Sequence, residues 1–141
     1  SAEILVKHFI YMLSNQHSKF LSVAEYADKL HITSKYLSTI CRCVTNKTPS
    51  QIINEYIIRE VKARLTNSNL SIKEISNIVG FANPSHFGVF IKRNTGKTAQ
   101  ELREELIWRD IVNPKAKFHQ RILCFFSMSA FIRTELDSVS S

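Results

Sequence analysis

The chain has 141 residues, of which 44% are hydrophobic, while glycine and proline occur only three times each. This composition is typical of a folded, helix-rich protein and excludes a disordered or membrane-embedded chain. No run reaches the roughly 18 apolar residues that a membrane-spanning helix needs. The chain starts with Ser1-Ala2-Glu3, which lacks the basic flank of a secretory signal. Because it also lacks a starting methionine, we expect a fragment of a longer protein.

The formal net charge is +7, and the excess lies entirely in the first 103 residues. Residues 1–55 carry a net +2, residues 56–103 carry +5, and residues 104–141 are neutral. This placement favours a polyanionic partner such as DNA; the alternative is a mildly basic protein with no such partner. Cys41, Cys43 and Cys124 show no disulfide pattern, which indicates a cytoplasmic protein, and no histidine pair lies near them at zinc-ligand spacing.

The first predicted helix has an apolar stripe made of Ile4, Leu5, His8, Phe9, Met12 and Leu13. A capping box, Ser22 with Glu25, then starts a short helix over residues 23–30, in which the small Ala27 permits close packing of a second helix. Either Thr33 or Ser34 caps that second helix. Its predicted apolar face consists of Tyr36, Leu37, Ile40, Cys41 and Val44, and Asn46 suits its left-handed end.

Another capping box, Thr48-Pro49-Ser50-Gln51, starts a long helix that extends to about residue 66. A third box, Ser71 with Glu74, starts a helix over residues 72–79, which contains the small Ser76 and ends at Gly80. Asn83 as N-cap and Pro84 at the first helical position then start a helix whose apolar residues are Phe87, Phe90 and Ile91. Gly96 ends it, and a box from residues 98 to 101 starts the last predicted helix.

The two halves of this pattern repeat each other. Residues 22–27 (SVAEYA) match residues 71–76 (SIKEIS) at an offset of 49. Residues 36–40 match 86–90, and residues 46–49 match 96–99, both at an offset of 50. One residue is therefore inserted in the turn of the second copy. Two copies of one supersecondary unit is the simplest interpretation.

Several motifs identify the family that this pattern resembles. They are Leu21-Ser22-Val23-x-Glu25, Tyr36-Leu37-Ser38, Leu70-Ser71-Ile72-x-Glu74-Ile75, Gly80-Phe81-x-Asn83-Pro84-Ser85-His86-Phe87, Phe90-x-Lys92 and Thr95-Gly96-Lys97-Thr98. Residues 3–103 resemble the DNA-binding domain of the AraC/XylS family of bacterial transcription regulators. The sequence departs from the family at Ala99 and Leu102, where proline and tyrosine are usual, at Cys41, and at Gly88-Val89, where a Ser-Arg pair is usual.

The repeat and the resemblance together predict an all-α fold with two helix-turn-helix (homeodomain-like) subdomains joined by a long connecting helix. We expect the first subdomain at residues 1–48, the connecting helix at 49–66, the second subdomain at 67–109, and a C-terminal tail of unknown role at 110–141. The tail is apolar around residues 122–126 and has no family counterpart. We expect it to pack on the domain or to self-associate, because an exposed patch of this kind aggregates.

The resemblance implies sequence-specific binding of double-stranded operator DNA, with one helix of each unit in the major groove. The expected base contacts are Lys35, Ser38, Thr39 and Arg42 in the first unit and Ser85, Gly88 and Val89 in the second. The expected phosphate contacts are Lys47, Lys92, Arg93 and Lys97. Arg59, Lys62 and Arg64 on the connecting helix are weaker candidates of the same kind. We expect packing roles for His86 and Trp108.

Alternative functions remain open at this point. A helical protein–protein interaction module would direct its basic face toward an acidic partner, and the output domain of a larger sensor protein would contain the same DNA-binding unit. The resemblance also implies a preceding sensor or dimerisation domain, with RNA polymerase as a second candidate partner. No phosphate-binding loop, nucleophile motif or paired carboxylates occur, so we expect neither enzyme activity nor a cofactor.

Overall fold

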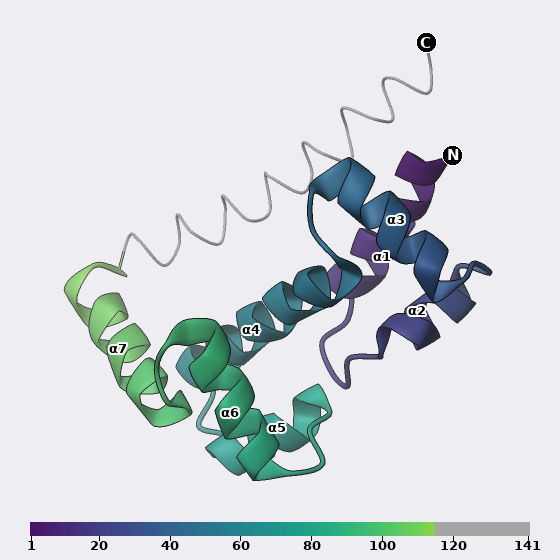
Figure 1. The fold of residues 1–141 in the computed structure, drawn as a ribbon. Coiled ribbons are helices and arrows are strands. Elements are labelled where there is room, and N and C mark those ends of the chain that lie inside the picture. The colour runs from purple at the N-terminus through teal and green to yellow at the C-terminus, as the bar shows by residue number, and fades with distance from the viewer. Residues whose placement is uncertain (115–141) are drawn as a thin grey trace. The chain divides into compact units, whose positions relative to one another are not determined.

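The computed structural model describes residues 1–114 of the chain, and these residues form helices joined by short turns (Figure 1). The chain divides into two compact units, Ser1–Arg103 and Glu104–Ser141, and each is considered by itself below. The apolar tail segment around residues 122–126 lies outside the described residues. The described part contains seven helices: α1 (Ala2–Ser14), α2 (Val23–Lys29), α3 (Ser34–Thr45), α4 (Pro49–Asn67), α5 (Ile72–Val79), α6 (Pro84–Thr95) and α7 (Ala99–Val112).

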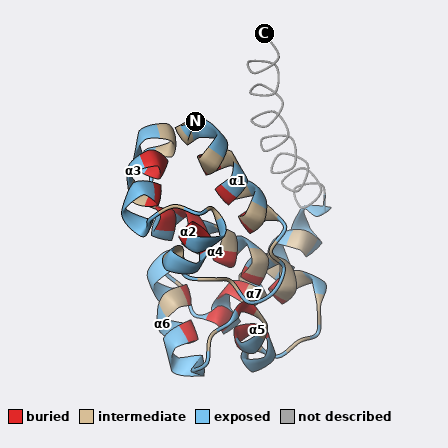
Figure 2. Cartoon of the chain, turned by 90° about the vertical axis from the view of Figure 1, so that its right-hand side faces the viewer, coloured by how far each residue is buried: buried red, intermediate tan, exposed pale blue. Residues whose placement is uncertain are grey.

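Two helix-turn-helix units and a shared helix make up the first compact unit. Helix α3 packs on α1 and α2, and α6 packs on α5, while α4 contacts α1 and α3 as well as α5 and α6. The predicted all-α fold, with two helix-turn-helix subdomains and a long connecting helix, is therefore confirmed. Figure 2 shows the buried positions on the inward sides of these helices.

Local hydrogen bonds at the helix starts explain why the boundaries fall where the sequence predicts them. The capping boxes of Ser22 with Glu25 and of Thr48 with Gln51 are complete, since each side chain accepts from the backbone N–H of the other residue. At α5 only half of the predicted box forms. The Ser71 hydroxyl accepts from the Glu74 N–H, but among the described residues no bond from the Ser71 N–H to the Glu74 carboxylate is present. Thr33 is the cap of α3.

Each unit has a core in which the first helix crosses the second at a small residue. Ala27 of α2 and Ser76 of α5 are 1% and 0% exposed, as the close crossing requires. The side chains of Phe9 and Tyr26 meet edge to face at 5.5 Å in the first unit, and Phe81 contacts Phe87 at 5.3 Å in the second. Such aromatic contacts contribute about 0.5–1.5 kcal/mol each beyond the area they bury.

The connecting helix α4 forms the part of the core that both units share. Its buried residues recur at helical spacing and are Ile52, Ile53, Ile57, Val61 and Leu65. The stripe predicted for α1 is only partly correct. Val6, Phe9 and Leu13 are the buried residues there, whereas Ile4 is 45% exposed. The stripe is therefore rotated by about a quarter turn at 3.6 residues per turn: Phe9 and Leu13 stay in it, while Val6 rather than Ile4 faces the core.

The described part of the second compact unit is the C-terminal portion of α7 and the residues after it, up to residue 114. An ion pair of 3.2 Å joins Arg109 and Glu105 one turn apart. Trp108 is 68% exposed, so the predicted packing role for this residue is wrong. Ile107, Ile111 and Val112 are also exposed.

Candidate nucleic-acid interface

The outer face of α3 carries the four predicted base contacts of the first unit. Lys35, Thr39 and Arg42 are exposed and Ser38 is half-buried, while Leu37, Ile40 and Cys41 hold the opposite side of the helix in the core. The Thr39 hydroxyl donates to the Lys35 carbonyl at 3.0 Å. Its proton is therefore engaged within the helix, and Thr39 offers an outside partner its methyl group and its oxygen lone pairs.

The outer face of α6 differs in chemistry from that of α3. Ser85, Gly88 and Val89 are all exposed, and Val89 is 64% exposed. A β-carbon added to Gly88 would have no atom within 4 Å, so no part of the described protein requires glycine there. A glycine within a helix costs about 1 kcal/mol relative to alanine. This face thus combines an open backbone surface with an exposed methyl-bearing side chain.

His86 belongs to the same exposed surface, which corrects the packing role predicted for it. The residue is exposed, while its neighbour Phe87 is 1% exposed and fills the core. The spacing of 86, 89 and 93 places His86 on the helical face of Val89 and Arg93, and this signal is visible in the sequence. Tyr36 was likewise predicted to be in the core, yet it is 45% exposed and shares the face of Thr39.

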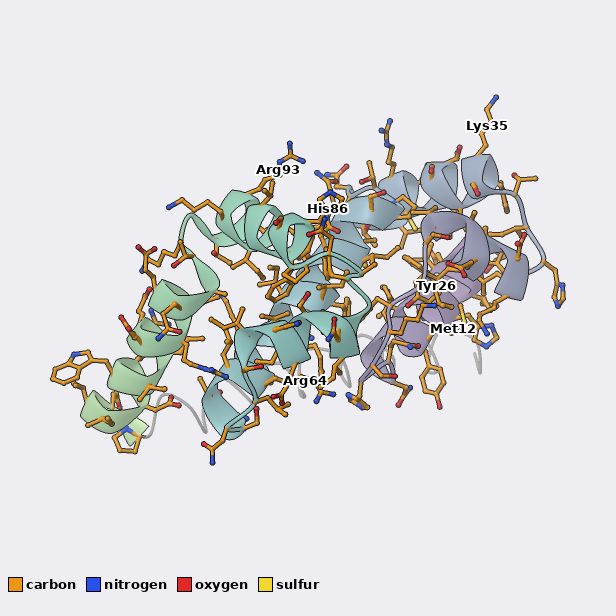
Figure 3. The ribbon with its side chains drawn as sticks, turned by 90° about the horizontal axis from the view of Figure 1, so that it is seen from below. Met12, Tyr26, Lys35, Arg64, His86 and Arg93 are labelled. Atoms are coloured by element: carbon orange, nitrogen blue, oxygen red, sulfur yellow. The ribbon has the colours of Figure 1, made fainter. Side chains whose placement is uncertain are left out.

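The outer faces of α3 and α6 point to a common side of the first compact unit. In Figure 3 the labelled side chains of Lys35, His86 and Arg93 lie along one edge of the ribbon, and Arg64 lies along the opposite edge. Since Lys35 belongs to α3 while His86 and Arg93 belong to α6, the second helix of each repeat contributes to the same surface.

The predicted phosphate contacts flank these helices, and their surroundings differ. Arg93 is exposed, and no ion-pair partner for it occurs among residues 1–114. The pKa of Glu101 lies below its ordinary value, chiefly because its carboxylate accepts from the Thr98 backbone N–H, and nearby Lys92 and Lys97 add to the effect. Lys47 forms an ion pair of 2.7 Å with Glu55, an acidic residue of α4 that the sequence analysis did not single out.

A second connection besides α4 holds the two helix-turn-helix units together. The Phe20 N–H in the α1–α2 loop donates to the Val79 carbonyl at the end of α5, at 3.2 Å. Next to this bond, a β-carbon added to Gly80 would lie 3.1 Å from Cγ of Lys19. We call this contact between residues 19–20 and 79–80 the clasp. Because it joins the α1–α2 loop to the turn before α6, it restricts how far one unit can rotate about α4 relative to the other.

Arg64 supports the same loop instead of facing the common surface. Its guanidinium lies 3.0 Å from the Glu60 carboxylate and donates to the His17 carbonyl. Glu60 is also 3.5 Å from the His17 ring. Together with its position on the opposite edge in Figure 3, these contacts give Arg64 a structural role, so the weaker prediction of a DNA contact at this residue is not supported.

The described residues also bear on the other functional classes. No helix within residues 1–114 is long and apolar enough to cross a membrane. In the same range there is no group of three or more His, Cys, Asp or Glu side chains arranged to hold a metal ion. The thiol of Cys41 is buried, and its burial raises its pKa to about 11.

The two helix-turn-helix units share one long helix, and the second helix of each is exposed on a common side. This arrangement defines a helix-turn-helix DNA-binding domain. A family model described as a helix-turn-helix domain matches residues 26–105. The chain belongs to the AraC/XylS family of bacterial transcription regulators, as its sequence predicts.

Individual relatives agree with this assignment. The chain is 33% identical over 95 residues to the Msm operon regulatory protein of Streptococcus mutans, in an alignment that covers 67% of this chain and 34% of that protein. Among solved structures, the C-terminal domain of AraT, a response regulator from Geobacillus stearothermophilus, matches with a TM-score of 0.64 at 19% identity, covering 72% of this chain and 84% of the other.

The DNA-binding domain of the transcriptional factor AdpA, solved in complex with a target DNA, matches with a TM-score of 0.64 at 18% identity. That match covers 78% of this chain and 96% of the AdpA domain, and it shows that the two share a fold. The chain spans about a third (34%) of the length of the curated relatives it matches.

Proposed function

We propose that this chain binds a specific double-stranded operator by placing α3 and α6 in two adjacent segments of the major groove. The observation that carries the proposal is the common direction of Lys35 on α3 and of His86 and Arg93 on α6 (Figure 3). An α-helix fits the major groove, and side chains on its outer face reach the base edges there. The AdpA domain, which has the same fold, was solved bound to DNA.

The length of the connecting helix sets a limit on how far apart the two units can lie. Helix α4 has 19 residues, which corresponds to a rod of about 28 Å at 1.5 Å per residue. Successive major-groove segments on one side of B-DNA are about 34 Å apart. Because α4 and the clasp both hold the units, the protein has little freedom to adjust this distance. We therefore propose that the DNA bends to meet both helices.

The two helices read DNA by different means in this proposal. On α3, Lys35 and Arg42 donate to guanine, Ser38 accepts or donates, and Thr39 contributes a methyl group for thymine and an acceptor oxygen. On α6, Ser85 supplies a hydroxyl, Val89 an apolar contact to a thymine methyl, and Gly88 a close approach of the backbone. The first unit thus selects bases by hydrogen bonds, and the second unit selects by methyl contact and groove shape.

Phosphate contacts fix the position of the domain on the duplex without reading its sequence. We assign this role to Lys92, Arg93 and Lys97 on the side of α6, and to Lys47 after α3. Each Lys or Arg that neutralises a phosphate makes the slope of log K against log salt steeper by about 0.9. Replacement of Arg93 by glutamine is expected to weaken binding to all duplexes equally and to reduce the slope by about 0.9.

Selection of bound sites from random duplex DNA tests the proposal. We expect one enriched motif with two parts about one helical turn apart. Lys35→Ala and Thr39→Ala are expected to relax the first part of the motif and leave the second part unchanged. If no motif is enriched, or if both variants retain the wild-type motif, α3 does not read bases, and the protein-interaction alternative gains support.

Bending is tested separately, by the gel mobility of complexes in which the selected site is moved along a fragment of fixed length. A bent complex migrates most slowly when the site is central. Equal mobility at every position would contradict a fixed distance between the two helices.

A further inference from the structure

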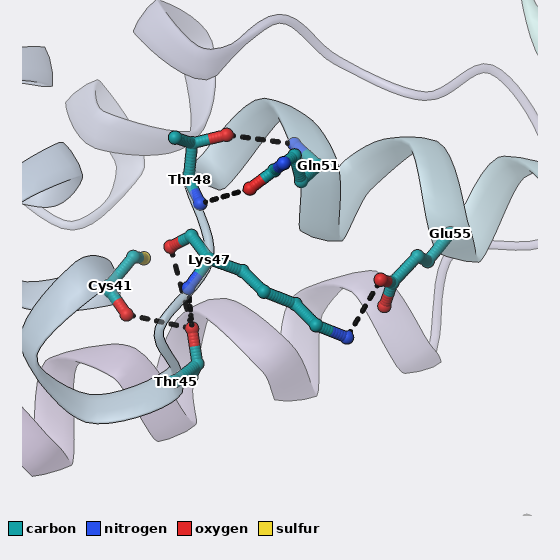
Figure 4. Close-up of polar contacts among 6 residues, drawn as sticks. All are labelled: Cys41, Thr45, Lys47, Thr48, Gln51 and Glu55. Carbon is teal, nitrogen blue, oxygen red and sulfur yellow. Dashed lines mark hydrogen bonds and ion pairs between the residues drawn. The ribbon is translucent and has the colours of Figure 1, made fainter.

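An ion pair lies between the end of α3 and the start of α4. The Lys47 Nζ is 2.7 Å from Glu55 Oε1, and the two side chains are 48% and 52% exposed. Figure 4 shows the Lys47 side chain extended alongside the first turns of α4 to reach Glu55. Lys47 follows Asn46, the left-handed cap of α3, and precedes the Thr48 cap of α4, so its backbone is fixed on both sides.

The pair lines a cleft between the C-terminal ends of α3 and α6. The cleft has a volume of about 330 Å³ and is lined by Lys47, Gln51, Asn54, Glu55, Ile58 and Asn94. Lys47 follows the Asn46 cap of α3, Asn94 belongs to the last turn of α6, and the other four residues belong to α4. The cleft thus reaches from the end of α3 to the end of α6, and if these two helices occupy neighbouring major-groove segments, as proposed above, it would face the DNA backbone that runs between them.

Stability does not explain an acidic side chain at this place. An ion pair between two half-exposed side chains contributes about 0–1 kcal/mol to folding. The caps at Thr33, Thr48 and Asn46 already fix the local backbone. A carboxylate in this cleft instead cancels the charge of Lys47, a cation well placed to meet a phosphate.

We infer that Glu55 acts as an internal substitute for a DNA phosphate, so that it neutralises Lys47 and limits the affinity of the domain for DNA. This inference rests on the proposed function, because it assumes that the α3–α6 surface meets the duplex. When DNA binds, a phosphate must displace the Glu55 carboxylate from the Lys47 ammonium. Because Lys47 and Glu55 together carry no net charge, the pair is expected to add nothing to the salt dependence.

Glu55→Gln tests the inference, because it removes the charge with almost no change of shape. We expect the slope of log K against log salt to become steeper by about 0.9, which corresponds to about fivefold tighter binding at 0.15 M salt when extrapolated from 1 M. The gain is expected on the selected site and on an unrelated duplex alike, since a phosphate contact carries no sequence information. Glu60→Gln, with the same charge change at the residue that binds Arg64, is the matched control and is expected to leave the slope unchanged.

A double-mutant cycle separates the loss of the pair from a general change of charge. In the wild-type background, Lys47→Gln is expected to change the slope by close to zero, whereas in the Glu55→Gln background it is expected to remove about 0.9. Arg93 has no ion-pair partner among residues 1–114, so Arg93→Gln is expected to remove about 0.9 in both backgrounds. Thermal melting of each variant verifies that all of them are folded.

Two results would overturn the inference. One is a Glu55→Gln slope equal to that of the wild type. The other is an equal loss on Lys47→Gln in both backgrounds, which would mean that Glu55 does not neutralise Lys47 in the complex. Failure of the proposed function gives a different result, because the wild-type chain would then show no salt-dependent binding to any duplex.

Discussion

Replacement of each glycine by alanine is expected to change stability with a sign set by its position. At Gly80, φ is +105° and an added β-carbon would lie 3.1 Å from Cγ of Lys19. A left-handed conformation costs an L-residue roughly 1–2 kcal/mol, and the reduced freedom of alanine in the unfolded chain offsets about 0.4–1 kcal/mol of this. With the Lys19 contact added, Gly80→Ala is expected to lower the free energy of unfolding by about 1–2 kcal/mol.

Gly88→Ala is the matched control, since the same atoms are added within a helix where space is open. It is expected to raise the free energy of unfolding by about 1 kcal/mol, because glycine is a poor helix former. Gly96→Ala separates strain from contact: φ at Gly96 is +77°, but among the described residues no atom lies within 4 Å of the added carbon. Gly96→Ala is therefore expected to lower the free energy of unfolding by less than Gly80→Ala does, and the difference measures the Lys19 contact at the clasp.

Thermal and urea unfolding followed by circular dichroism measure all three variants. A change of 1 kcal/mol corresponds to about 4–8 °C in Tm for a domain of this size, so the two opposite shifts are easily resolved. If Gly80→Ala melted at the wild-type temperature, neither the left-handed turn nor the clasp would be under the constraint described here. If Gly88→Ala were destabilising, the outer face of α6 would be packed against something within the protein.

Three further substitutions and one labelling experiment test other local features. Ser76→Ala is expected to raise the free energy of unfolding by about 1 kcal/mol, because the buried hydroxyl of Ser76 has no hydrogen-bond partner among the described residues. A decrease of the free energy of unfolding in urea would contradict this. His31→Gly is expected to raise Tm by a few degrees, since His31 has φ +58° and glycine adopts this conformation without strain. Iodoacetamide followed by peptide mass analysis is expected to modify exposed Cys43 and to spare Cys41, whose buried thiol has a pKa of about 11; equal labelling would refute this. The Ser22 backbone N–H donates to the Glu25 carboxylate and holds the pKa of Glu25 below its ordinary value, so this group stabilises the fold at pH above its ordinary pKa, and the effect is lost as pH falls through the lowered pKa. Glu25→Gln is therefore expected to lose less stability than the wild type between pH 7 and pH 3.

Features set by neighbouring residues could be predicted from the sequence. Caps such as Thr48 with Gln51 depend on side chains three positions apart, so the motif that suggests the helix start also supplies its hydrogen bonds. Ala27 and Ser76 were identified as small crossing residues because the repeat aligns them. The family motifs led to the correct fold for the same reason, since they consist largely of caps, turns and core positions.

Features that depend on the far side of a helix or on distant residues could not be predicted. An apolar side chain at the edge of a helical stripe, such as Ile4 or Tyr36, fits the helical spacing whether it is buried or exposed, and only the packing partner decides which. The clasp joins Phe20 to Val79, which are far apart in the sequence and match no motif. The pair of Lys47 and Glu55 was missed because the two residues lie on different elements, and only the path of the chain through the turn at Thr48 brings them together.

The surface that we propose for DNA binding is also the place where this chain carries residues that do not stabilise the fold. Gly88 weakens α6 while no atom of the described residues uses the space beside it, and Val89 exposes an apolar side chain to water. Tyr36 does the same on α3. Departures of this kind concentrate at functional sites, because a partner rather than the core determines the residue there. On α6, the absent side chain at Gly88 is itself what would allow the backbone to approach the groove closely, so a change that makes the helix more stable is expected to make its fit to DNA worse.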